Sequence, residues 1–164
     1  MPTLIKQRKL TADTWKLLQE GGIFPASGDV IVPLSLWQAK RDALIARVGR
    51  TGVWLKPDDE PAALATDFAV LPLIAVQFPA FTDGRGYSTA RLLRERYGYS
   101  GELRAIGDMQ RDTVFYLSRV GFDAIALRDG EDAEAALSAF EDFTEAYQVS
   151  VERPQPLFRR RLAA

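Results

Sequence analysis

The chain has 164 residues, of which 47% are hydrophobic and 26% are charged, and its formal net charge is -1. These values predict one folded domain with a sizeable core, and they exclude a general attraction to nucleic acid or to an anionic membrane. No apolar run approaches the roughly 20 residues that span a bilayer, and the first residues lack a charged region followed by an apolar stretch. We therefore expect a cytoplasmic protein without a signal peptide.

The sequence contains no cysteine and no histidine. Disulfides, thiol nucleophiles and thiolate-bound metals or clusters are therefore excluded for this chain, as are histidine bases and histidine-ligated metals. Any acid–base chemistry falls to Asp, Glu, Lys, Tyr or water. Because the sequence also has no Asp-rich cation loop and no nucleotide-binding fingerprint, we predict no metal site and no cofactor.

The N-terminal part predicts a β-hairpin. Two extended segments, residues 3–10 and 14–19, are joined by residues 11–13. The glycines at 21 and 22 break this pattern, and the chain up to Asp29 is expected to be a loop.

From Val30 onward, short apolar runs alternate with helical patterns. The expected strands are residues 30–32, 53–55, 73–76, 103–106 and 123–127, and the expected helices are 35–48, a short one near Pro61, 88–97, 108–120 and 132–143. The predicted N-cap residues are Ser35, Asp58 or Asp59, and Asp108. Alternation of this kind predicts right-handed crossovers between parallel strands.

We therefore predict an α/β fold in which an N-terminal β-hairpin is followed by repeated β-α units that form a mainly parallel sheet with flanking helices. A partial β/α barrel is the alternative, because the units are short and regular. Residues 1–152 are expected to form a single domain. Residues 153–164, which include Pro154, Pro156 and three consecutive arginines, are expected to form an extended basic C-terminal arm.

Three loops that follow consecutive predicted strands carry mixed charges: residues 81–88, 107–112 and 128–130. In a parallel sheet such loops share the edge at the carboxyl ends of the strands, where ligands bind in open α/β folds. We therefore expect the charged side chains of the three loops to lie close together. The candidate ligand-binding residues are Asp83, Arg85, Gly86, Tyr87, Ser88, Arg91, Asp108, Arg111, Arg128 and Asp129.

The first loop gives the strongest indication of anion binding. Its glycines precede a helix N-terminus, whose free N–H groups favour anions, and Arg85 can grip a phosphate, sulfate or carboxylate group in a bidentate manner. Tyr87 and Ser88 can donate hydrogen bonds. The alternative is purely structural: a tight turn with a helix cap in the first loop, a solvated first helical turn at Arg111, and an ion pair between Arg128 and Asp129.

The stretch from Leu73 to Leu127 contains the segments Ile74–Val76, Phe81–Ser88, Gly101–Ala105 and Gly121–Ala124. With these segments, the chain resembles, over roughly residues 28–150, the bacterial family called domain of unknown function nine-three-four. The resemblance implies a context, because such proteins are encoded beside assimilatory sulfite reductase and are labelled as oxidoreductases of sulfite reduction. It implies no catalytic residue and no cofactor.

The absence of cysteine conflicts with that label, because a redox role would need a bound flavin or nicotinamide. We therefore predict an accessory, non-catalytic partner of sulfite reductase. The alternative is an enzyme that acts on a small anion, such as sulfite, sulfate or a phosphate-like group, at the strand-end loops. A third possibility is a regulatory protein that binds a sulfur metabolite.

Overall fold

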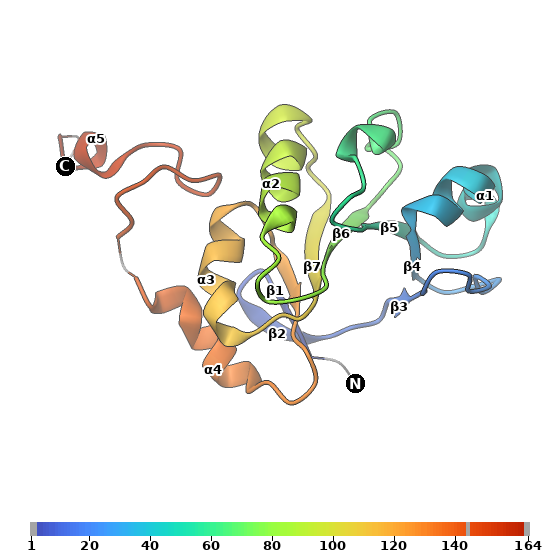
Figure 1. Cartoon of the computed structure of the whole chain (residues 1–164), viewed down its shortest axis with the longest axis horizontal. Helices are drawn as coiled ribbons and strands as arrows, with labels where there is room; N and C mark the ends of the chain where they lie inside the picture. The colour runs from blue at the N-terminus through green and yellow to red at the C-terminus, as the bar shows by residue number, and fades with distance from the viewer. Residues whose placement is uncertain (1–2, 144, 163–164) are drawn as a thin grey trace.

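A computed structural model describes residues 3–143 and 145–162 (Figure 1). Its centre is an eight-stranded sheet, curled into a half-barrel, with the strand order β2-β1-β8-β7-β6-β5-β4-β3. The strands are β1 (Thr3–Lys6), β2 (Lys9–Ala12), β3 (Lys16–Leu17), β4 (Val30–Pro33), β5 (Thr51–Leu55), β6 (Leu73–Phe78), β7 (Glu102–Gly107) and β8 (Ala124–Ala126). Strands β3 to β8 pair in parallel with their neighbours, whereas β1 is antiparallel to both β2 and β8.

Helices lie between the successive strands from β4 to β8, as the sequence predicts, and also after β8. They are α1 (Leu34–Ala46), a 3-10 helix (Pro61–Leu64), α2 (Arg85–Arg91) with a π-helical continuation (Leu92–Arg96), α3 (Arg111–Arg119), α4 (Ala133–Ser138) with a 3-10 continuation (Ala139–Glu141), and α5 (Leu157–Leu162). The mainly parallel sheet with flanking helices and an antiparallel N-terminal hairpin is therefore confirmed. None of the helices in the described part of the chain is long and apolar enough to cross a membrane.

The central strands are buried on both faces, which explains their almost continuous apolar sequences. One face contributes Val53, Ile74 and Leu103 to a large core that also contains the buried side chains of α1, α2 and α3. The opposite face carries a smaller core, which Trp15 covers from the connection between β2 and β3. This second core consists of Ile31, Trp54, Leu73, Ala75 and Ile106.

A buried ion network fixes that connection to the sheet. The Arg104 side chain on β7 is only 2% exposed; its Nη1 donates to both carboxylate oxygens of Asp13 at 2.9 Å, and its Nε donates to Glu102 at 2.8 Å. Lys6 adds an ion pair to Glu102 at 2.7 Å. Since an unpaired buried charge is costly, the segment around Asp13 is held across the second face of the sheet.

The predicted boundaries of the hairpin are wrong. The turn falls at Gln7 and Arg8, whose φ angles are +49° and +60°, so that β1 pairs with residues 9–12. The second predicted segment instead supplies β3, which pairs in parallel with β4 at the far edge of the sheet. A two-residue turn with positive φ at both positions matches the twist of the strands, although its residues are not the usual glycine or asparagine.

Two predicted N-caps are also wrong. Helix α1 begins at Leu34, and the Ser35 hydroxyl donates to Glu20 instead of capping the helix. The residue before the 3-10 helix is Glu60, not an aspartate, although Pro61 occupies the first turn as expected. The C-terminal arm is not extended throughout, because α5 forms within it; Arg160 of α5 pairs with Glu145 at 2.7 Å.

Candidate functional site

The three charged loops meet at one edge of the sheet. They follow β6, β7 and β8, which are parallel neighbours, so their carboxyl ends point the same way. Asp108 joins all three loops. Its Oδ2 accepts a hydrogen bond from the Phe81 backbone N–H at 3.0 Å, and its Oδ1 accepts one from Arg128 Nη1 at 2.9 Å.

These contacts give Asp108 a different role from the predicted one. Helix α3 begins at Arg111, its N-cap is Gln110, and no side chain caps it. Asp108 lies before this helix and faces the neighbouring loops instead. The guanidinium of Arg128, followed by the N–H of Phe81, lowers the pKa of the Asp108 carboxyl, so this carboxylate is ionised at neutral pH.

The charged side chains of the first loop pair with each other and with Asp58. Arg85 Nε donates to Asp83 Oδ1 at 3.0 Å, Nη2 donates to Asp83 Oδ2 at 2.6 Å, and Nη1 pairs with Asp58 from the loop after β5. The Arg85 side chain thereby lowers the pKa of Asp83 and keeps that carboxyl ionised. Two carboxylates already neutralise the guanidinium that the sequence suggested for anion binding.

Gly86 was expected before a helix N-terminus, but it lies in the first turn of α2 and serves packing. A Cβ atom at this position would lie 2.6 Å from the ring of Phe78, so the glycine allows α2 to approach β6 closely. Tyr87 is half-buried between Phe78 and Tyr116, with ring centroids 5.1 and 4.9 Å away. Burial raises the pKa of its phenol, which therefore keeps its proton at neutral pH.

The remaining candidates separate into two groups. Arg111 pairs with Asp142 at 2.8 Å, and its backbone N–H donates to Glu131 at 3.3 Å. Glu131 also accepts from Arg128 at 2.9 Å, so this glutamate, which the sequence analysis missed, links the two arginines. Arg128 thus pairs with Asp108 and Glu131, and not with Asp129 as in the structural alternative.

Three further candidates do not converge on these contacts. Arg91 pairs with Glu95 one helical turn away at 3.0 Å, instead of reaching back to the first loop. Ser88 and Asp129 are exposed. The strand-end edge therefore holds two sets of ion pairs. Arg85 pairs with Asp58 and Asp83, and Arg128 pairs with Asp108 and Glu131.

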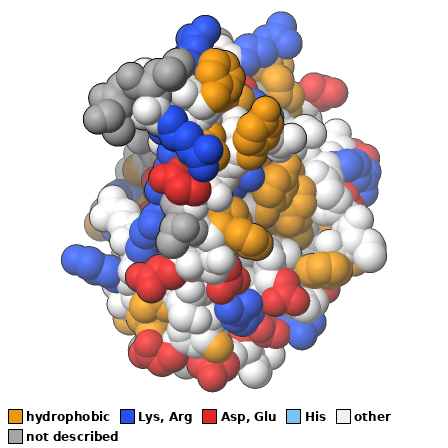
Figure 2. All heavy atoms as spheres, turned by 90° about the vertical axis from the view of Figure 1, so that its left-hand side faces the viewer, with side chains coloured by type: hydrophobic (Ala, Val, Ile, Leu, Met, Phe, Trp, Pro, Cys, Tyr) orange, Lys and Arg blue, Asp and Glu red, His pale blue; other side chains and the backbone are white. Residues whose placement is uncertain are grey.

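A second feature is an exposed apolar surface on the side of the molecule that carries α3 and the C-terminal segment. Figure 2 shows hydrophobic side chains gathered there, with basic side chains beside them. We call this surface the apolar face and define it by Tyr116, Phe143, Tyr147 and Val149, which are 49%, 62%, 76% and 46% exposed. The hollows between these side chains are also lined by Phe115, Arg91 and Arg119.

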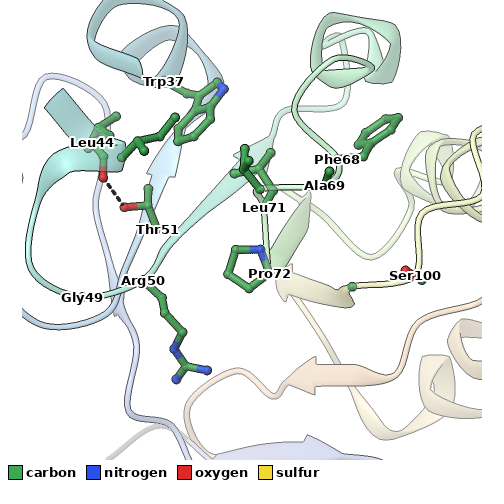
Figure 3. A pocket seen from close by; sticks show the side chains of 13 residues that line it. Trp37, Leu44, Gly49, Arg50, Thr51, Phe68, Ala69, Leu71, Pro72 and Ser100 are labelled. Atoms are coloured by element: carbon green, nitrogen blue, oxygen red, sulfur yellow. Dashed lines mark hydrogen bonds between the residues drawn. The ribbon is translucent and has the colours of Figure 1, made fainter. Parts of the chain in front are cut away.

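A cavity lies at the opposite edge of the sheet, near the amino ends of β5, β6 and β7. It has a volume of about 480 Å³, and Figure 3 shows its walls. The lining residues come from α1, from residues 49–51 and 68–72, and from the turn before β7. The sequence predicts a ligand site only at the carboxyl ends of the strands, so this cavity was not predicted. Its one signal in the sequence is the apolar stretch Phe68–Leu71 shortly before β6.

Within the described residues, no group of three or more Asp or Glu side chains is arranged to hold a metal ion. No curated protein matches the chain. The model of one bacterial family matches residues 52–158, which is well over half of the 164 residues. The chain therefore belongs to the family described as bacterial protein of unknown function (DUF934).

Proposed function

We propose that the protein is a non-catalytic accessory protein of assimilatory sulfite reduction, and that it binds sulfite reductase through the apolar face. The pathway rests on the family resemblance described above. The binding role rests on one observation, the exposure of four large apolar side chains around two hollows that share Arg119 and Gln148. The proposal requires no cofactor.

The composition of the apolar face supports a protein partner. Contiguous exposed apolar patches are uncommon on monomeric proteins and mark interaction surfaces. Aromatic and arginine side chains are enriched in protein interfaces. Here Phe143 and Tyr147 line one hollow and Tyr116 lines a second, and Arg119 lines both. The Phe115 ring packs on Phe143 with centroids 5.0 Å apart, which helps to hold Phe143 in place on this surface.

The state of the charged edge supports a non-catalytic role. A general acid or base works best when its pKa lies near the operating pH. The pKa values of Asp83 and Asp108 are instead lowered by the arginines beside them. Together with the absence of thiols and imidazoles, this leaves the edge without an evident proton-transfer group.

The proposal is tested with the purified protein and the purified sulfite reductase of the same organism. We expect a complex that migrates as one species in analytical ultracentrifugation. The double variant Phe143→Ser/Tyr147→Ser should weaken this complex by at least ten-fold, because truncation of central interface side chains commonly costs about 2 kcal/mol or more each.

The matched control is Ile23→Ser, since Ile23 is 91% exposed and lies in the loop before β4, outside the apolar face. This variant should bind the reductase like the wild type. Two results would refute the proposal: no complex at micromolar concentrations, or equal binding by the wild type and the double variant.

A small-anion-binding enzyme is the second candidate. It is favoured by the meeting of the loops after β6, β7 and β8 at the edge where ligands bind in open α/β folds. The pairing of Arg85 and Arg128 with carboxylates weighs against it. A regulatory protein that binds a sulfur metabolite is the third candidate, and the anion experiment in the Discussion tests whether such a ligand binds at the same edge.

A further inference from the structure

We propose that the cavity at the amino ends of β5, β6 and β7 binds one organic anion with an apolar body, whose acidic group pairs with Arg50. The cavity shares no residue with the apolar face. This inference therefore stands or fails independently of the proposed partner role.

The apolar part of the cavity has buried side chains at its base and exposed side chains at its rim. Trp37, Leu44 and Leu71 line it and are only 2%, 1% and 2% exposed, whereas Ile45 and Val70 also line it but are 47% and 50% exposed. Figure 3 shows Trp37 and Leu44 on one wall and Leu71 and Pro72 on the facing wall. A volume of about 480 Å³ lies within the range of small-molecule sites. An apolar body of this size would rest on the buried side chains, and the exposed rim would leave part of it in contact with water.

The polar part of the cavity is dominated by Arg50, which extends along the end away from Trp37 (Figure 3). One edge of its guanidinium is fixed, because Nε and Nη2 donate to Asp29 Oδ2 at 3.0 and 2.5 Å. The Arg50 guanidinium also lies over the ring of Trp15, 4.8 Å from the centroid. The hydrogen bonds that Arg50 donates to described carboxylates all go to Asp29, and none of them comes from Nη1. Asp29, and after it the carboxylate of Glu102, raise the pKa of Arg50.

The walls of the cavity are held in place by side-chain hydrogen bonds. Asp67 accepts from Trp37 Nε1 and from Arg41 Nε, both at 2.8 Å, which joins α1 to the segment before β6. The Thr51 hydroxyl donates to Leu44 O at 3.1 Å, and the Tyr99 hydroxyl donates to Leu71 O at 2.9 Å. A preformed site loses less conformational freedom on binding, which favours a ligand.

The combination of these parts selects the ligand class. An apolar wall alone would accept any neutral hydrophobic compound, and a guanidinium alone would accept inorganic anions. A fixed guanidinium beside buried apolar walls favours a compound that has both parts, such as an aromatic or branched carboxylate or sulfonate. Arg50 is 60% exposed, so its acidic partner would remain partly solvated.

The test uses two fluorescent probes that share an apolar body. One is 8-anilinonaphthalene-1-sulfonate, which carries an anionic group, and the other is N-phenyl-1-naphthylamine, which does not. We expect one sulfonate probe per chain, with a roughly ten-fold loss of affinity in Arg50→Met, since a hydrogen bond to a charged group is removed. The neutral probe should bind Arg50→Met and the wild type equally.

A second variant fills the cavity. Ala69 lines it and is exposed, so Ala69→Trp can occupy the space without a change in the core, and it should abolish the binding of both probes. Phe143→Ser on the apolar face should change neither. The inference is overturned if Ala69→Trp binds the probes normally, if Arg50→Met weakens both probes equally or neither, or if Phe143→Ser removes the bound probe.

Discussion

The carboxylate of Asp108 accepts a hydrogen bond from the guanidinium of Arg128 at 2.9 Å, although twenty positions separate the two residues. The contact joins the ends of β7 and β8, and a second oxygen of Asp108 accepts from the backbone N–H of Phe81 after β6. The edge at which the sequence predicts a ligand site is thus fastened by internal contacts. The first role of the charged side chains at this edge is therefore to hold the three loops together.

The first prediction concerns the pH dependence of this contact. Because the folded state lowers the pKa of Asp108, the ionised carboxylate stabilises the fold above the ordinary aspartate pKa of about 3.9. That contribution is lost as the pH falls below about 4. Asp108→Asn should therefore lower the melting temperature at neutral pH and make it fall less steeply in acid.

The measurement is the melting temperature of both proteins by circular dichroism across the acid range. Asp129→Asn is the matched control, because Asp129 is exposed and accepts no hydrogen bond from any described residue. It should follow the wild type. An Asp108→Asn curve parallel to that of the wild type would contradict the prediction.

The sequence predicts the central β-α units well because their signals are local. Leu73–Val76, for example, is a continuous apolar run, and it forms the buried core of β6. The hairpin was misplaced because Gln7 and Arg8 adopt positive φ without glycine or asparagine, so no local signal marks the turn. The placement of β3 depends on pairing with β4, which is set by distant parts of the chain.

The meeting of the charged loops was predictable from the parallel topology, but their pairings were not. Arg85 could pair with Asp83 from sequence proximity, whereas its contact with Asp58 depends on β5 and β6 being neighbours. Arg104 and Asp13 are 91 positions apart, and their pairing depends on how the β2–β3 connection crosses the sheet. A charged residue between two apolar ones in a buried strand was the only sign of that network.

The second prediction concerns Asp67, which is 5% exposed and joins α1 to the segment before β6. Asp67→Ala should lower the free energy of unfolding by about 1–3 kcal/mol, because the buried N–H of Trp37 loses its acceptor. Urea denaturation measures this change. Asp42→Ala removes a fully exposed partner of the same Arg41 and should change stability by less than about 0.5 kcal/mol. Equal effects of the two variants would show that the buried hydrogen bond from Trp37 to Asp67 contributes no more to stability than the exposed pair of Arg41 and Asp42.

The third prediction concerns the buried network of the second face. Arg104→Met should lower the free energy of unfolding by about 3–5 kcal/mol, because the carboxylates of Asp13 and Glu102 are left near the sheet without their partner. Lys6→Met removes a cation with a 42% exposed side chain from the same glutamate and should cost at most about 1 kcal/mol.

Hydrogen exchange provides a second measurement for Arg104→Met. Amides around Asp13 and Trp15 should exchange faster in this variant than in the wild type, since the network holds this connection on the sheet. Unchanged protection there would mean that Trp15 alone retains the segment, whatever the change in global stability.

The fourth prediction concerns anion binding at the carboxyl edge. Two carboxylates neutralise Arg85, so sulfate or sulfite should raise the melting temperature of the wild type only through its general effect on protein surfaces. We expect the same increase in Arg85→Ala as in the wild type, measured against sodium chloride at matched ionic strength.

Arg91→Ala is the control, because it removes an exposed, carboxylate-paired arginine from the same helix. If protection by the anion disappears in Arg85→Ala but persists in Arg91→Ala, the edge binds anions in spite of its internal pairs. The small-anion enzyme would then replace the accessory protein as the favoured function.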